Sequence, residues 1–599
     1  MSDLRPAKDK HQALLWRLPL IFCLFLSFSS GYCQSPPSAD AQSPDPVRRV
    51  NAPHFDEQVP FSEMATLWFG QVNNTDNYAD VRVGYNDEYL RVNITAFDRY
   101  LWYDTTPGSD LDEWDAATLY LDLEEDGGGA PATDDYRLVA QINWWEVRSN
   151  YQKAFRGDGN HWMVASTAFT TTSGWRGTNL NRNGSDNDDR GWTLNFYIPF
   201  ASLGLPGPPA DGDCWGMALA MHDRDDAVAS SPIADKTWPE DAQDAQPDTW
   251  GQLVFNPPAY QRPPAFASGT AIIRHKLNGA IVTDAAVGGH TDCGNGLDFW
   301  NEWGDANYAG GSPVNIQNQS DVADWPCFSK YYVTFPLNAL PPGKVIISAT
   351  LTLHQIGSAG EPDQRQPSLI QVLTVDEAWG EATLTWNNAP LARENVSSAW
   401  VDPTSFPGWP GLPREWDVSS ATAQAYHAGI PLRLVLYEAD SAYHSGKYFV
   451  SCDTGDWNAV GRPTLTVLWG NSQPLITKQV WPASTTNGDL ITYTLRWLGS
   501  GQPLTMTDNL PNGLSAPGPI SASTGSAHYN PSARQIAWTG IPANGQAVTI
   551  TFPVTVQVGG PLALYNTAVL SAGNLYLSSD TALVIIDGYP IYLPQIVKP

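Results

Sequence analysis

The sequence has few basic residues and little charge of either sign. Lysine and arginine number 33 against 62 aspartates and glutamates, only 16% of the 599 residues are charged, and the formal net charge at pH 7 is −29. A chain this acidic is repelled by phosphates, which argues against a nucleic-acid partner. No long apolar run follows the N-terminus, which excludes a membrane channel and predicts no transmembrane segment after signal cleavage.

Several catalytic motifs are also missing. The chain contains no Gly-x-Ser-x-Gly, no His-Glu-x-x-His and no Cys-x-x-Cys, so it lacks the nucleophile elbow, the zinc-protease motif and the zinc-ribbon or redox motif. A glycosidase needs two carboxylates that face one sugar bond, and the sequence does not locate such a pair among its 62 acids. We therefore predict a protein that is not an enzyme, with a hidden active site as the alternative.

Aromatic and turn-forming residues are abundant. The chain has 25 Trp, 24 Tyr and 19 Phe, which is enough aromatic surface for several cores and excludes disorder. Its 50 Gly and 48 Pro favour many turns and short strands over long helices. At roughly 100–200 residues per domain, the length predicts about three to five domains.

The N-terminus has the order of a secretory signal peptide. Four basic side chains precede the apolar run Leu18–Phe28, and small residues follow. The run is too short to span a bilayer, so we expect residues 1–33 to be a signal peptide and the mature protein to be secreted, extracellular or at the cell surface. Cleavage is expected after Cys33 or after Ala41. Acylation of Cys33 is the less favoured alternative, because bulky Tyr32 precedes it.

Four of the six cysteines belong to the predicted mature chain. They are Cys214, Cys293, Cys327 and Cys452, an even number that suits disulfides in an oxidising compartment. We favour a Cys293–Cys327 disulfide, which would staple an irregular Gly/Asn-rich stretch. Four buried free thiols are the alternative.

Strand patterns occur throughout the mature chain. Tyr89–Ile94, Leu490–Trp497 and Ala547–Val556 alternate apolar and polar residues, as half-buried strands do. Such strands bury one face only against another sheet, so the predicted fold is all-β, with three consecutive β-sandwich (jelly-roll or Ig-like) domains. Proline-rich and polar seams give the boundaries: a linker over 34–50, modules over 51–260, 261–470 and 471–587, and a tail over 588–599.

Charge and tryptophan are distributed unevenly among these modules. Residues 51–260 hold 12 basic and 34 acidic side chains, whereas residues 471–599 hold four of each. The three modules contain 11, 10 and 3 tryptophans in turn. The third module is therefore predicted to be a spacer, and the first two to carry the functional surfaces.

The first module resembles carbohydrate-binding module family 9. The resemblance rests on an ordered series of segments, which includes Ala79–Tyr85, Leu90–Ile94, Trp114–Asp122, Gly191–Phe200 and Thr249–Phe255. It implies a β-sandwich that grips a sugar between two tryptophan rings. The apolar C–H face of a pyranose stacks on an indole, while an arginine supplies a planar fork of donors for the hydroxyls.

Carried over by position, the resemblance implies three ligand-binding residues. Trp114 and Trp238 would form the aromatic pair, and Arg137 would bind sugar hydroxyls. The family carries a carboxylate where this chain has Thr118, which is a departure from the pattern. For each tryptophan, a place in the core or at its rim is the alternative.

The other two modules resemble two further families. The second is similar to the DNRLRE domain in Tyr331–Phe335, Ile347–Leu353, Trp379–Pro390 and Arg462–Leu468, and members of that family have been linked to polysaccharide binding. Trp379 and Trp386 are expected to lock a turn and the core. The third module is similar to the Ig-like domain of unknown function 11 in Ile491–Leu495, Thr507–Leu514 and Ile536–Gly540, which implies a stalk or spacer.

Two acidic loops of the first module are candidates for a structural metal. Asp122–Gly127 and Ser185–Gly191 cluster carboxylates beside glycine, and Ca²⁺ takes six to eight oxygen ligands. Structural Ca²⁺ is one interpretation and solvated turns are the other. No other cofactor is expected.

Together these features predict a secreted or cell-surface, non-catalytic protein that binds a polysaccharide or cell-wall glycan. Two weak glycan-binding modules on one chain would raise avidity through effective concentration. A structural or adhesive envelope protein is the first alternative. A carbohydrate-active hydrolase or lyase is the second.

Overall fold

The structure is a computed structural model of the full chain. It describes residues 47–143, 147–177, 189–225, 233–263, 265–289, 296–319, 327–439, 442–472, 474–573 and 575–588. The predicted signal peptide, most of the predicted linker and nearly all of the predicted tail lie outside these residues.

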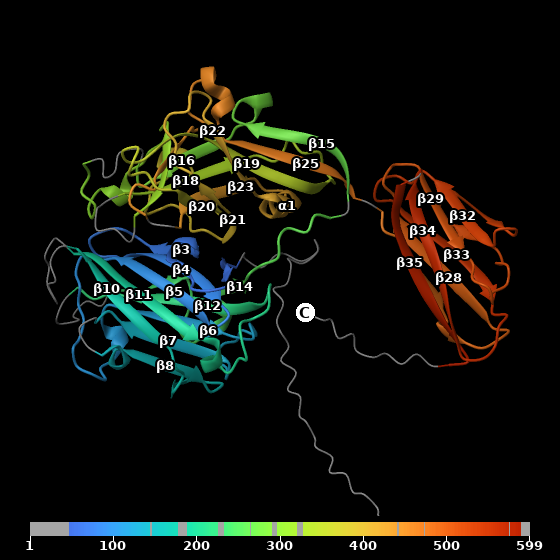
Figure 1. Cartoon of the computed structure of the whole chain (residues 1–599), viewed down its shortest axis with the longest axis horizontal. Coiled ribbons are helices and arrows are strands. Elements are labelled where there is room, and N and C mark those ends of the chain that lie inside the picture. The colour runs from blue at the N-terminus through green and yellow to red at the C-terminus, as the bar shows by residue number, and fades with distance from the viewer. Residues whose placement is uncertain are drawn as a thin grey trace, which may run out of the picture.

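The predicted fold class is confirmed, because the regular secondary structure of the described residues is mostly β-strand, arranged as several sandwiches (Figure 1). One α-helix, α1 (Ser419–Ala428), occurs in this part of the chain. No helix there is long and apolar enough to cross a membrane. Short 3₁₀ helices occupy many turns: η1 (Phe61–Glu63), η2 (Leu111–Glu113), η3 (Arg148–Asn150), η4 (Phe200–Leu203), η5 (Pro247–Thr249), η6 (Leu277–Gly279), η7 (Trp303–Asp305), η8 (Glu381–Thr383) and η9 (Asp456–Gly461).

The first sandwich packs an eight-stranded sheet against a six-stranded one. In β6, Leu119 and Leu121 belong to the core between the sheets, whereas Tyr120 belongs to a separate cluster on the outer face, as the period of two requires. The larger sheet runs β1 (Arg49–Ala52), β14 (Gly251–Phe255), β12 (Cys214–His222), β6 (Ala116–Asp122), β7 (Asp135–Gln141), β8 (Gln152–Gly157), β9 (Trp162–Ala165), with β13 (Lys236–Trp238) beside β12. The smaller runs β10 (Thr170–Gly177), β11 (Asp189–Pro199), β5 (Tyr89–Phe97), β4 (Tyr78–Asn86), β2 (His54–Phe55), with β3 (Ala65–Gly70) beside β4.

The middle sandwich is one continuous series of paired strands that encloses a core. Side chains from both ends of the series, such as Ile273 and Ile370, pack in the same cluster, so the two halves face each other across it. The order is β15 (Ala265–Arg274), β25 (Thr464–Ser472), β19 (Val345–Ser358), β24 (Lys447–Phe449), β17 (Val314–Asn318), β18 (Phe328–Phe335), β23 (Leu432–Glu438), β20 (Ser368–Thr374), β21 (Glu394–Val401), with β16 (Thr283–Val287) beside β18 and β22 (Leu412–Asp417) beside β19.

The third sandwich lies apart from the other two in Figure 1 and has its own core. From the rest of the chain, Phe266 packs against this core. One sheet runs β26 (Thr477–Trp481), β28 (Leu490–Leu498), β33 (Ala547–Thr555), β30 (Ser521–Ala522), and the other runs β27 (Ser484–Thr485), β35 (Leu575–Ile586), β34 (Leu562–Ala572), β29 (Leu504–Asn509), β32 (Gln535–Gly540), β31 (Ser526–Asn530).

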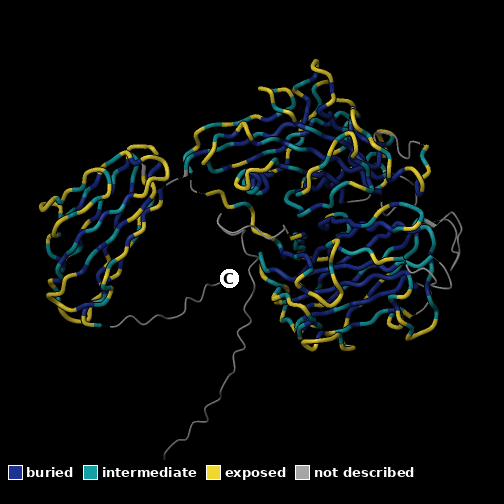
Figure 2. Tube along the Cα trace, turned by 180° about the vertical axis from the view of Figure 1, so that it is seen from behind, coloured by how far each residue is buried: buried dark blue, intermediate teal, exposed yellow. Residues whose placement is uncertain are grey.

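The first two sandwiches share a hydrophobic cluster, and the strands of both are largely coloured as buried in Figure 2. Trp68, Tyr78 and Phe97 come from the first sandwich and pack with Trp386 and Tyr437 of the second. Among the predicted features of the second module, Trp379 and Trp386 do pack in a core, and it is this shared one. The two sandwiches therefore form a single packed body.

A buried lysine lies at the centre of this shared cluster. The Nζ of Lys330 lies 3.6 Å from the ring centroid of Trp386 and 4.1 Å from that of Trp68, and donates a 2.6 Å hydrogen bond to the hydroxyl of Tyr78. Tyr78 and Tyr437 in turn donate to the carboxylate of Asp80. Burial holds the pKa of Lys330 well below its ordinary value.

Candidate functional site

An aromatic site lies on the outer face of the larger sheet of the first sandwich. Tyr120 of β6, Arg137 of β7, Trp162 of β9 and Trp250, just before β14, converge there with Asp244 from the preceding loop. The Tyr120 and Trp250 ring centroids are 5.3 Å apart. The Trp162 and Trp250 rings are parallel within 3°, with centroids 6.4 Å apart. We call these five residues the aromatic site.

Strand register places these side chains together. Tyr120 is paired directly with Arg137 across β6 and β7, and Arg137 with Phe155 across β7 and β8, so all three project from the same face. The Arg137 guanidinium lies 5.1 Å from the Phe155 ring centroid. On the other side, Tyr120 is paired with the small Ala218 of β12, which leaves room for the Trp250 indole in the same cluster.

Two carboxylates orient the polar groups of the aromatic site. Arg137 Nη2 lies 2.5 Å from Asp112 Oδ2, and Arg137 Nε lies 3.7 Å from Asp244 Oδ1. The indole N–H of Trp162 donates to the same Asp244 oxygen at 3.0 Å. Burial alone would lower the pKa of Arg137. Tyr120 and the two carboxylates favour its charged form more strongly, so the pKa of Arg137 is raised above its ordinary value. The pKa of Tyr120 is raised, first by burial and then by Asp244.

One donor in this site takes part in an ion pair but makes no hydrogen bond. The Nε of Arg137 is buried and has no hydrogen-bond acceptor among the described residues. A buried donor without an acceptor is costly, so a ligand oxygen that displaced the Asp244 side chain, 3.7 Å away, would be favourable there. Together with a half-buried Trp162, the arrangement can hold a ligand that has a flat apolar face and a rim of hydroxyls.

Of the three predicted ligand-binding residues, only Arg137 lies in the aromatic site. Trp238 is 1% exposed and belongs to the inner core, so both faces of its ring are covered by protein. Trp114 is half-buried beneath the guanidinium of Arg224, whose central carbon lies 4.1 Å from the ring centroid. Among the described residues, no hydrogen bond, ion pair or ring contact joins Trp114 or Trp238 to Arg137.

The sequence analysis missed three aromatic members of the site. Tyr120 and Trp250 stand inside the segments Trp114–Asp122 and Thr249–Phe255 that carry the resemblance to family 9, so a signal for them was present. Trp162 stands in no such segment. Its part depends on β9 pairing with β8, which a pattern along one strand does not reveal.

Thr118, where the family carries a carboxylate, belongs to a hydrogen-bonded chain. Its Oγ1 lies 2.8 Å from His222 Nε2, and His222 Nδ1 lies 3.0 Å from Asp235 Oδ2. The residue types and order are those of a nucleophilic triad, but Thr118 is fully buried. This series of hydrogen-bonded side chains therefore joins β6 to β12 and to the segment before β13, and the Thr118 hydroxyl is not exposed to solvent.

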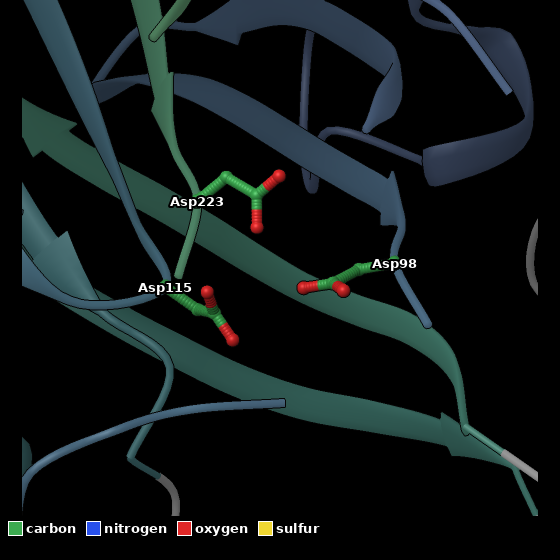
Figure 3. A group of neighbouring side chains, drawn as sticks. All are labelled: Asp98, Asp115 and Asp223. Atoms are coloured by element: carbon green, nitrogen blue, oxygen red, sulfur yellow. The ribbon is translucent and has the colours of Figure 1, made fainter. Parts of the chain in front are cut away.

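Three carboxylates of the first sandwich, two of them buried and that of Asp223 partly buried, point toward one another (Figure 3). Asp98, Asp115 and Asp223 each offer one oxygen, and these oxygens lie within 4.8 Å of one another. Burial raises the pKa of Asp98 to about 7 and that of Asp223 to about 9, and the neighbouring carboxylates add to both shifts. Such a group needs bound protons or a cation, and oxygen ligands of this kind suit Ca²⁺.

A second carboxylate group falls on one of the two acidic loops named from sequence. Asp122, Asp126 and Asp134 bring their oxygens within 4.8 Å of one another, next to Gly127. The other loop, Ser185–Gly191, lies mostly outside the described residues. A third group, Asp284, Glu381 and Asp453, belongs to the middle sandwich.

The structure bears on only part of the predicted cysteine pairing. Cys452 is a buried free thiol. Cys293 lies outside the described residues, so the Cys293–Cys327 disulfide stays a prediction.

Comparison with known proteins gives one family match. Residues 301–458, inside the middle sandwich, match the family described as Carbohydrate-binding module family 96. No curated protein matches the chain.

Many solved structures are similar to parts of the chain, and two of them are carbohydrate-binding proteins by their descriptions. One is a carbohydrate-binding module family 9 from Caldicellulosiruptor kristjanssonii in complex with cellotriose, at 15% identity, covering 35% of this chain and 95% of that chain, with a TM-score of 0.24. The other is a putative carbohydrate-binding protein from Bacteroides uniformis, at 12% identity, covering 35% of this chain and 99% of that chain, with a TM-score of 0.25.

Proposed function

We propose that this chain is a secreted, non-catalytic polysaccharide-binding protein whose principal glycan site is the aromatic site of the first sandwich. The match of the middle sandwich to a carbohydrate-binding module family supports the class. The order of basic, apolar and small residues at the N-terminus supports export. The third sandwich, which is neutral and lies apart, serves as the spacer.

The observation that carries this proposal is the parallel pair Trp162 and Trp250 beside Arg137. The half-buried indole of Trp162, backed by Trp250, takes up the C–H face of a pyranose, and the guanidinium of Arg137, whose Nε makes no hydrogen bond within the protein, donates to a ring or hydroxyl oxygen. Asp112 and Asp244 fix the guanidinium plane and accept from sugar hydroxyls with their remaining lone pairs. The site thus combines apolar stacking with convergent polar groups, as small-ligand sites do.

Charge narrows the class of glycan. The first sandwich region 51–260 holds 12 basic against 34 acidic residues, so its surface repels polyanions. Uncharged polysaccharides are therefore the expected ligands. Acidic ones such as alginate would bind weakly at low salt and somewhat better as salt screens the repulsion.

A titration of the secreted full chain tests the proposal. Cello-, xylo-, manno- and chito-oligosaccharides are added singly while tryptophan emission and heat are followed. At least one uncharged oligosaccharide should bind saturably, and Trp162→Ala should weaken that binding about tenfold or more. Trp481→Ala, which removes an 80% exposed indole from the third sandwich, is the matched control and should bind normally. No saturable binding to any member would contradict the proposal.

A further inference from the structure

A second group of aromatic rings stands exposed on the middle sandwich. Phe406, Trp409 and Trp457 are 57%, 50% and 68% exposed. The Phe406 and Trp409 ring centroids are 5.1 Å apart and the Trp409 and Trp457 centroids 4.8 Å, and both pairs are edge-to-face. We call these three residues the aromatic platform. It involves η9, the orange coil at the top of Figure 1, and no residue of the aromatic site.

The platform is held in place by two tight segments. Trp409 stands in the turn between Gly408 and Gly411, which is closed by a 2.9 Å hydrogen bond from the Gly411 N–H to the Gly408 carbonyl. Both glycines have positive φ, +87° and +105°, which other residues adopt only at a cost. A Cβ on Gly461 of η9 would lie 2.7 Å from the Pro410 carbonyl oxygen. The turn and η9 are thus in close contact.

Trp457 is fixed by its neighbour in η9. Asp456 accepts a 2.6 Å hydrogen bond from Nη2 of Arg462, whose side chain is 2% exposed. Arg462 also donates to the carbonyl of Thr454 through Nε and Nη2. Because the anchoring arginine is buried, the indole is presented by a rigid support, so little conformational entropy is lost when a ligand stacks on it.

The platform has the composition of a ligand surface. Contiguous exposed apolar groups on a folded protein mark interaction sites, and here all three are aromatic. The rim is polar: the exposed Lys276 lies 3.4 Å from the exposed carboxylate of Asp456, which gives donors and acceptors beside the rings. Aromatic faces with a mixed polar rim suit a pyranose chain, which has apolar C–H faces and a rim of hydroxyls.

The size of the platform argues against a protein partner. A stable protein interface buries about 800 Å² on each partner, far more than three rings and their rim provide. A second copy of this chain is therefore the poorer fit. All three rings lie within residues 301–458, the part that matches a carbohydrate-binding module family.

We propose that the aromatic platform is a second polysaccharide-binding site, which stacks on the pyranose units of an uncharged glycan chain. This inference rests on the proposed function, since it assigns the same class of ligand to a separate surface. Engagement of both sites by one polysaccharide makes the second contact intramolecular, so the affinity for a long chain exceeds that for a short oligosaccharide.

Polysaccharide binding by the full chain tests the inference. The probes are microcrystalline cellulose, insoluble xylan, insoluble mannan and chitin for depletion, and soluble hydroxyethylcellulose for affinity electrophoresis. Against the best-bound probe, the double variant Trp409→Ala/Trp457→Ala should weaken binding about 10-fold or more, as should Trp162→Ala. The triple variant should abolish it, while Trp481→Ala should bind like the wild type. Circular dichroism and unfolding midpoints confirm that each variant is folded.

Footprinting of the unmodified protein gives a second readout that needs no variant. Hydroxyl-radical oxidation of Trp409 and Trp457 should fall at least twofold when the best-bound polysaccharide is added, whereas oxidation of Trp481 should not change.

The outcomes separate this inference from the proposed function. If Trp162→Ala loses binding while the platform variant binds normally and its rings are not protected, the inference is overturned and the proposed function stands. If the wild type binds no probe, the proposed function and the inference both fall. If the platform variant instead converts a dimer to a monomer in sedimentation with binding unchanged, the surface is a self-association site and the inference is overturned.

Discussion

A fully buried ion pair stabilises the geometry of the third sandwich. Lys478 Nζ and Asp508 Oδ2 lie 2.6 Å apart, and neither side chain is exposed to solvent. Burial lowers the pKa of Lys478 to about 8 and raises that of Asp508, because each charge has lost its water. In such a pair the desolvation cost nearly offsets the attraction, so losing one partner is far worse than losing both.

Substitutions at this pair should be strongly non-additive. Asp508→Ala leaves a buried ammonium without its partner and should lower the free energy of unfolding of the third sandwich by about 3–5 kcal/mol. The double variant Lys478→Met/Asp508→Leu should recover most of that loss, since it packs apolar groups of similar size. The free energies of unfolding of both variants can be measured in urea by hydrogen exchange, followed by mass spectrometry on peptides of residues 474–588. Equal losses in the two variants would contradict this account.

The same lysine predicts a pH dependence. Its ordinary pKa of 10.5 applies to the unfolded chain, and the folded pKa is about 8. Between these values the unfolded state binds more protons, so this group makes the third sandwich more stable as pH rises from 8 to about 10. The gain, on the order of 1–3 kcal/mol, should appear as a difference between the wild type and Lys478→Met in urea unfolding at pH 7.5 and pH 9.5. If the stability difference between the wild type and Lys478→Met is the same at both pH values, burial does not lower the pKa of Lys478.

The tryptophans show where sequence reasoning works and where it ends. Arg137, which the resemblance along one strand placed by position, lies in the aromatic site, and its role in ligand binding stays a prediction. Trp238 was not an exposed ring, because β13 is only three residues long and its pairing with β12 turns the indole into the core. Trp162 reaches Trp250 from the far edge strand, through contacts 88 positions apart in the chain. The local periodicity of the sequence predicts neither the burial of Trp238 nor the contact between Trp162 and Trp250.

At the scale of the element, strands were the predictable part of the fold. Tyr89–Ile94 lies in β5, and Leu490–Trp497 and Ala547–Val556 coincide closely with β28 and β33. Alternation identified them because one face of each strand packs on a core. The pairing order, such as β6 lying between β12 and β7, depends on contacts between distant segments and had no signal in a single sequence.

One glycine controls the path of β11. Gly191 has φ +114°, and a Cβ there would lie 1.8 Å from the carbonyl oxygen of Ala96 on β5. Gly191→Ala should therefore force the two strands apart and destabilise the first sandwich by about 3 kcal/mol or more. Gly207→Ala, where a Cβ would meet nothing within 4 Å, is the control and should change stability little. Unfolding midpoints followed by tryptophan emission compare the two, and equal midpoints would refute the prediction.

At the scale of the whole molecule, the shared cluster makes the first two sandwiches one cooperative unit. Calorimetry of the full chain should show one transition for both and a separate one for the third sandwich. Trp68→Ala removes a large ring beside Lys330 and should lower the joint transition by several degrees without moving the other. Separate transitions for the first two sandwiches would contradict this. A fragment cut near residue 260 should aggregate, since it exposes Trp68, Tyr78 and Phe97.

The lysine-centred cluster between the sandwiches also bears on which material the protein would recognise. Because the shared cluster packs the two sandwiches together, it limits changes in the distance between the aromatic site and the aromatic platform. Two binding sites at a nearly fixed distance are matched better by a polysaccharide whose repeating units are held in order, as in a crystalline fibre, than by a soluble coil whose segments move freely. On the proposed function, we expect ordered polysaccharide fibres to bind this body better than amorphous gels of the same sugar do.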